Sequence, residues 1–130
     1  MKANELRIGN WYKGDCLAQQ YWQITAQEIL DFYDDPIDDY FQPILLSEHW
    51  LEKLGFKKNN KNRWVKEKSN YAVFYREYYA TGEDNSMWRI EYHDTDYGNN
   101  EYKDCHQFGD KIKYVHKLQN LYFALTQEEL

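Results

Sequence analysis

The sequence has few cysteines, whose disulfides and metal sites stabilise many very small or secreted proteins. It contains two, Cys16 and Cys105, which are too few and too far apart for a disulfide framework or a zinc knuckle. No apolar run reaches the length of a membrane span, and the opening MKANELRIGN lacks the apolar core of a signal peptide. We therefore expect a cytoplasmic protein with reduced cysteines and no membrane partner. The length of 130 residues predicts a single domain over residues 1–130.

Basic residues are also in short supply. The chain has 16 Lys and Arg against 22 Asp and Glu, which gives a formal net charge of -6 and a sequence pI near 5.2. Binding to nucleic acid without regard to its sequence depends on Lys and Arg displacing counterions, so the composition disfavours that activity. A basic protein partner remains compatible with this charge.

Aromatic side chains are abundant. There are 13 Tyr, 5 Trp and 6 Phe in 130 residues. Tyr and Trp combine a large apolar body with a polar tip, so they suit strands, cores and binding surfaces alike. One small core is not expected to bury all of these rings, and some of them are candidates for a binding surface.

Local signals predict strands and a short helix near the N-terminus. Residues 7–13 read as a strand that ends in a Gly-Asp turn, and residues 16–24 read as the returning strand. Thr25 is the expected N-cap of a helix, with Glu28 completing a capping box. Pro36 prevents this helix from continuing past residue 35.

The segment FQPILLSEHWLEKLGF predicts a capped helix over residues 47–54. Ser47 is the expected N-cap, and Gly55 suits the left-handed position that ends a helix. The inward stripe of this helix comprises Trp50, Leu51 and Leu54.

The middle of the chain favours an antiparallel sheet. A hairpin is expected to turn at residues 59–62, and NYAVFYREYY and MWRIEYHD are rich in strand-forming residues. In the second of these, apolar Trp88, Ile90 and Tyr92 alternate with the remaining side chains, so we expect a sheet with one wet face. The residues expected on that wet face are Met87, Arg89, Glu91 and His93.

Helical spacing of apolar residues predicts a C-terminal helix near residues 111–125, with His116 on its polar side. The expected fold is therefore α+β: a mostly antiparallel β-sheet with a short capped helix and a C-terminal amphipathic helix packed on it.

Three segments, ELRIGNW, PILLSEHWLEKLGF and YVHKLQNLYFALTQEEL, together resemble a family of small uncharacterised proteins encoded by Bacteroidetes and their phages and mobile elements. The resemblance covers both ends and the middle of the chain, and the closing segment is the most specific part. It implies a phage or mobile-element accessory protein. It implies no catalytic residues.

The segment HDTDYGNNEYKDCH, residues 93–106, is the densest group of chemically active side chains. It does not match the calcium loop of an EF-hand, because Gly98 and Cys105 occupy ligand positions. A zinc site would need His93 with Cys105 and His106, yet neighbouring strand residues point to opposite faces. The favoured interpretation is a polar hairpin, and metal-dependent hydrolysis around His93 is the remote alternative. We assign no catalytic residue, metal or cofactor.

Two groups of residues are candidates for binding. The first is an acidic cluster beside aromatic residues, and the second places tyrosines on one strand next to Arg89 and His93 on the following strand. From these we expect a non-enzymatic protein that binds a host or phage protein, such as a host-defence component. The alternative is a small-nucleotide-binding protein that uses a Tyr/Trp/Arg pocket. The acidic candidates are Asp34, Asp35, Asp38 and Asp39, and the aromatic ones are Tyr71, Tyr75 and Tyr79.

Overall fold

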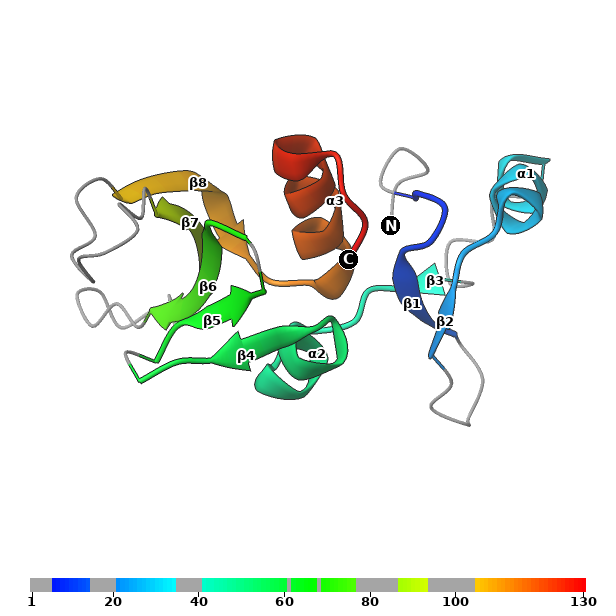
Figure 1. The fold of residues 1–130 in the computed structure, drawn as a ribbon. Coiled ribbons are helices and arrows are strands. Elements are labelled where there is room, and N and C mark those ends of the chain that lie inside the picture. The colour runs from blue at the N-terminus through cyan, green and yellow to red at the C-terminus, as the bar shows by residue number, and fades with distance from the viewer. Residues whose placement is uncertain are drawn as a thin grey trace. The chain divides into compact units, whose positions relative to one another are not determined.

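The computed structural model describes residues 6–14, 21–34, 41–60, 62–67, 69–76, 87–93 and 105–130. For residues 31–34, 41, 76, 93 and 105–110 it describes the backbone alone. The fold is α+β, as predicted, with antiparallel strand pairing throughout both of its sheets (Figure 1). The backbone divides into two compact units, one formed by residues 1–45 and 114–130 and the other by residues 46–113. The prediction of a single domain stays a prediction.

The first unit combines the two ends of the chain. Its three-stranded sheet has the order β2-β1-β3. Two helices, α1 and α3, complete the unit, and α3 contacts β1. The bounds are β1 Trp11–Gly14, β2 Tyr21–Gln23, α1 Ala26–Asp34, β3 Phe41–Gln42 and α3 Val115–Thr126.

Helix α1 starts where the capping signals predicted. The backbone N–H of Thr25 donates to Glu28 Oε2 at 2.7 Å, and the N–H of Glu28 donates back to Thr25 Oγ1 at 3.4 Å. Both groups would otherwise be unsatisfied at a helix N-terminus, so the pair stabilises the first turn. Ile29 packs on the small core made by Tyr12 and Ile24, which holds α1 to the sheet.

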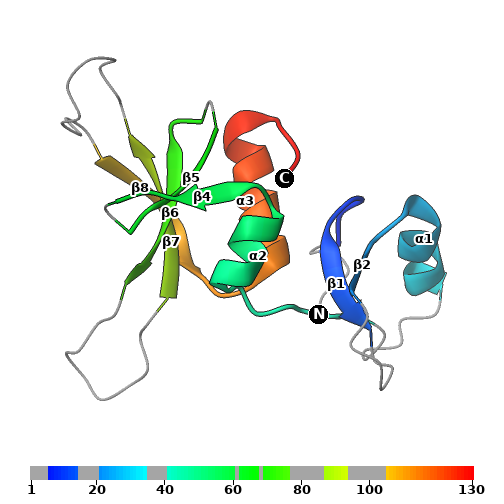
Figure 2. The same ribbon diagram turned by 60° about the horizontal axis from the view of Figure 1, so that its bottom comes forward.

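The second unit is a five-stranded sheet in the order β4-β5-β6-β7-β8, preceded by α2. Figure 2 shows these strands fanned by the twist normal for β-sheets. Helix α2 contacts β4. The bounds are α2 Glu48–Lys53, β4 Phe56–Lys58, β5 Trp64–Lys66, β6 Tyr71–Arg76, β7 Met87–His93 and β8 Cys105–Ile112.

Helix α2 confirms the prediction made from its caps. The Ser47 side chain accepts from the N–H of Trp50, and Gly55 has φ +94. The Gly55 N–H donates to the carbonyl of Glu52, one of the two bonds of a Schellman ending. The predicted inward residues, Trp50, Leu51 and Leu54, are all buried.

Three local expectations need correction. Residues 111 and 112 end β8 and do not begin the C-terminal helix, which starts at Val115 because the strand continues pairing to Ile112. His116 was expected on the polar side of that helix but is 1% exposed. Glu91 was expected on a wet face but is 4% exposed, because Arg63 neutralises its charge there.

No helix in the described parts of the chain is both long and apolar enough to cross a membrane.

Candidate binding surfaces

The strand register assigns the residues of the five-stranded sheet to two faces. Val73 pairs with Ile90 and Phe74 pairs with Arg89 across β6 and β7. Side chains alternate along a strand, so residues in step with Val73 share one face and those in step with Phe74 share the other. We call these the Val73 face and the Phe74 face.

The Val73 face carries aromatic pairs at both ends of β6 and β7. Tyr71 meets Tyr92 edge to face with ring centroids 5.2 Å apart, and Tyr75 meets Trp88 in the same way at 5.2 Å. Between the pairs, Val73 is fully buried. The tyrosines therefore flank a closed core and do not form one continuous aromatic surface.

Tyr75 is the most exposed member of these pairs. Its exposed fraction is 48%, whereas its neighbour Trp88 is 8% exposed. The Trp88 indole N–H donates to the carbonyl of Leu46 at 3.0 Å, which fixes the ring on which Tyr75 rests. A rigid tryptophan beneath an exposed tyrosine is the kind of aromatic anchor found at the centre of protein interfaces.

The Phe74 face is organised by a charge pair that the sequence analysis missed. Arg63 Nη1 lies 2.8 Å from Glu91 Oε2, and the Arg63 guanidinium carbon lies 4.2 Å from the centroid of the Phe74 ring. Ala72 and Phe74 are buried on this face too. Residues far apart in sequence form the arrangement, so no local motif could have revealed it.

The predicted tyrosine and arginine residues do not converge. Tyr71 and Tyr75 lie on the Val73 face, whereas Arg89 pairs with Phe74 and lies on the other. Tyr79 lies outside the described residues. The register thus separates the aromatic and cationic members of the predicted nucleotide pocket.

The remaining predicted residues are described in part. His93 ends β7, where the register pairs it with Cys105 and pairs His106 with Tyr92. Cys105, and not His106, is therefore opposite His93. Residues 94–104 lie outside the described part of the chain, and the described residues contain no group of three or more His, Cys, Asp or Glu that could hold a metal ion.

Of the predicted acidic cluster, Asp34 ends α1, and Asp35, Asp38 and Asp39 lie outside the described residues.

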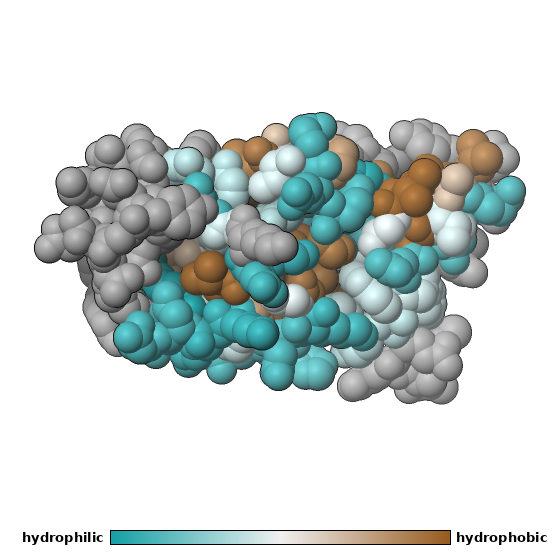
Figure 3. Space-filling view, in the orientation of Figure 1, coloured by the Kyte–Doolittle hydropathy of each residue, from teal (hydrophilic) through white to brown (hydrophobic). Residues whose placement is uncertain are grey.

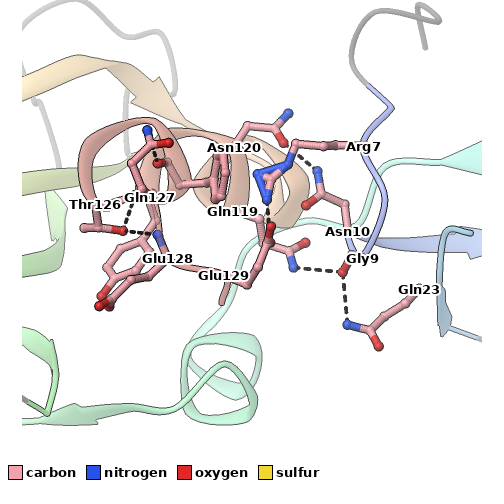
Figure 4. Close-up of polar contacts among 12 residues, drawn as sticks. Arg7, Gly9, Asn10, Gln23, Gln119, Asn120, Thr126, Gln127, Glu128 and Glu129 are labelled. Carbon is pink, nitrogen blue, oxygen red and sulfur yellow. Dashed lines mark hydrogen bonds and ion pairs between the residues drawn. The ribbon is translucent and has the colours of Figure 1, made fainter. Parts of the chain in front are cut away.

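The first unit contains a polar network that joins the two ends of the chain (Figure 4). Asn10 Nδ2 donates to Asn120 Oδ1 at 2.6 Å, and the backbone N–H of Trp11 donates to Gln119 Oε1 at 2.9 Å. Asn10 and Gln119 are both almost completely buried. Buried amides need such partners, so the network fixes the register of α3 against the segment that leads into β1.

His116 is the third buried polar side chain of the first unit. Its ring stacks against Tyr12 with centroids 5.3 Å apart and against Tyr114 at 5.8 Å. Its helical position predicted a solvated residue, but the ring is buried and stacks on two tyrosines. This ring stack gives Tyr12 and Tyr114 a structural role.

No protein-family model, curated protein or solved structure matches this chain.

Proposed function

We propose that the chain is a non-enzymatic accessory protein of a phage or mobile element, and that it acts by binding a host protein such as a defence component. The observation that supports this proposal is the exposed Tyr75 on the buried Trp88. Tyrosine and tryptophan are enriched among residues that carry most of the energy of protein interfaces. The resemblance of the terminal and central segments to phage-encoded proteins supports the accessory role.

Small-nucleotide binding remains the alternative function. It is less well supported, because the register places Tyr75 and Arg89 on opposite faces of the sheet. The predicted pocket would need its tyrosine rings and Arg89 on the same face.

The test is native mass spectrometry of the tagged protein purified gently from its host, repeated after denaturation. A host polypeptide bound in fixed stoichiometry is the expected result. Added mass of a few hundred daltons that leaves on unfolding would favour the nucleotide alternative instead. Bare protein under conditions that preserve known complexes of the same host would contradict the proposal.

Two variants make the test specific. Tyr75→Ser should abolish binding of the host polypeptide, because it removes the aromatic anchor. Tyr21→Ser is the matched control, since Tyr21 is also a strand tyrosine and is 39% exposed. Both variants should melt within a few degrees of the parent protein, which separates lost binding from lost folding.

A further inference from the structure

Among its described residues, the first unit exposes three large aliphatic side chains. Ile8, in the turn before β1, is 57% exposed, Leu30, on α1, is 58% exposed, and Leu45, which lies on neither of these elements, is 61% exposed. Exposed aliphatic residues are ordinary when scattered singly, and they indicate a contact surface when they adjoin one another. The question is whether Ile8 and Leu30 belong to one surface.

Backbone and core contacts place the turn before β1 beside the segment that leads into α1. The N–H of Gly9 donates to the carbonyl of Ile24 at 2.9 Å, and the Gln23 side chain donates to the carbonyl of Gly9 at 3.0 Å. Leu6 and Ile29 pack against the same two core residues, Tyr12 and Ile24.

Leu6, two residues before Ile8, and Ile29, next to Leu30, thus share one small core, whereas Ile8 and Leu30 are themselves exposed. In Figure 3, hydrophobic atoms gather over the turn before β1 and the adjoining side of α1.

The unit that carries these residues has a large excess of negative charge. No Lys or Arg occurs between Lys13 and Lys53, a stretch that contains nine Asp and Glu. The first unit has four Lys and Arg against ten Asp and Glu, whereas the second has twelve of each. The formal charge of -6 therefore belongs entirely to the unit that exposes Ile8 and Leu30.

The cation next to Ile8 in the sequence is already paired with an acidic residue. Arg7 precedes Ile8, but its guanidinium is ion-paired with Glu129 and lies 4.0 Å from the centroid of the Phe123 ring. On α1 itself, Asp34 follows Leu30 by one helical turn and no basic residue is present.

From these observations we infer that Ile8 and Leu30 form the apolar centre of a docking surface for a basic amphipathic segment of a partner protein. Aliphatic side chains of the partner would cover Ile8 and Leu30, and its Lys and Arg would face the carboxylates of the first unit. The inference rests on the proposed function, since it names the chemistry of the partner and a contact site separate from Tyr75.

The experiment uses the full chain, labelled with ¹⁵N, and two synthetic helical peptides that differ only in charge. One peptide consists of Leu and Lys in an amphipathic pattern, and the other has Glu in place of Lys. The Lys peptide should shift the amide signals of residues 8–9 and 26–34, and its affinity should fall as salt rises from about 0.05 to about 0.5 M, because screening weakens the attraction. The Glu peptide should cause no shifts.

Matched variants test the apolar centre. Leu30→Gln and Ile8→Gln should each lower the affinity for the Lys peptide about tenfold, the loss expected when one aliphatic anchor is removed. Leu45→Gln is the control, because Leu45 is equally aliphatic and 61% exposed but lies on neither the turn nor α1. It should change the affinity less than about twofold.

The inference would be overturned if the Lys peptide did not bind, if the amide shifts lay elsewhere, or if Leu45→Gln lowered the affinity as much as Leu30→Gln. Sedimentation velocity of the unbound chain tests for a different occupant: a dimer that Leu30→Gln dissociates would mean that a second copy covers this surface. These peptide results are independent of the host purification, so failure of this docking surface and failure of the proposed function can be told apart.

Discussion

Arg63 and Glu91 form an ion pair on the Phe74 face of the five-stranded sheet, and the two side chains differ sharply in burial. The Glu91 side chain is 6% exposed and the Arg63 side chain 30%. The arginine also covers the Phe74 ring, so it both neutralises the carboxylate and packs against the sheet.

This asymmetry predicts unequal effects of removing either charge. Arg63→Met should lower the free energy of unfolding by about 2–4 kcal/mol, because it leaves a buried carboxylate without this arginine. Glu91→Gln should cost about 1 kcal/mol, because the freed guanidinium can reach water. Urea denaturation at neutral pH measures both values, and a larger loss for Glu91→Gln would contradict this account.

An exposed ion pair provides the control for that comparison. Lys58 Nζ lies 3.1 Å from Glu48 Oε1, with both side chains more than 40% exposed. Glu48→Gln should change the free energy of unfolding by less than about 1 kcal/mol, as is usual for solvated pairs.

A residue larger than glycine at position 14 should clash with the Trp22 ring. A Cβ built on Gly14 would lie 1.8 Å from Cη2 of the Trp22 ring. Gly14→Ala should therefore destabilise the protein by about 1–3 kcal/mol through overpacking. A double-mutant cycle tests the cause: in a Trp22→Leu background the cost of Gly14→Ala should fall by more than half, and an unchanged cost would mean that the ring is not responsible.

Arg7 should contribute more to stability than its ion-pair partner. Glu129 is 60% exposed, so Glu129→Ala should cost less than about 0.5 kcal/mol. Arg7→Ala also removes the contact with the Phe123 ring and should cost about 1–2 kcal/mol. Thermal melts of the two variants, followed by circular dichroism, provide the comparison, and equal shifts would argue against a role for the ring contact.

Charge reversal of the acidic cluster should weaken partner binding without unfolding the protein. Changing Asp34, Asp35, Asp38 and Asp39 to Lys removes the negative charge to which a basic partner is attracted. The host polypeptide should then be lost at physiological salt, and the melting temperature should change by only a few degrees. Retention of the partner at full stoichiometry would show that these aspartates take no part in binding.

Sequence reasoning succeeded where the stabilising interaction spans a few residues. Two capping hydrogen bonds, between Thr25 and Glu28 and between Ser47 and the N–H of Trp50, each lie within one helical turn. The left-handed conformation of Gly55 is likewise a local property of the helix end. The same holds for the hairpin between β4 and β5, where the Asn59 side chain accepts from the N–H of Arg63 at 3.0 Å.

The errors concern residues whose environment comes from distant parts of the chain. Glu91 looked solvated because alternation assigns a polar residue to a wet face, yet Arg63, 28 residues away, neutralises it. His116 looked solvated because its helical position is polar, yet Tyr12 stacks on it from the other end of the chain. Neither partner could be identified from spacing.

The sequence by itself determined the α+β class, the caps of α1 and α2, and the concentration of acidic charge between Lys13 and Lys53, because each follows from residue type and short-range spacing. Only the tertiary structure decided which face Tyr75 and Arg89 occupy and that Ile8 lies beside the segment leading into α1. Strand register and long-range packing decide such relationships, because moving a strand by one residue exchanges its two faces.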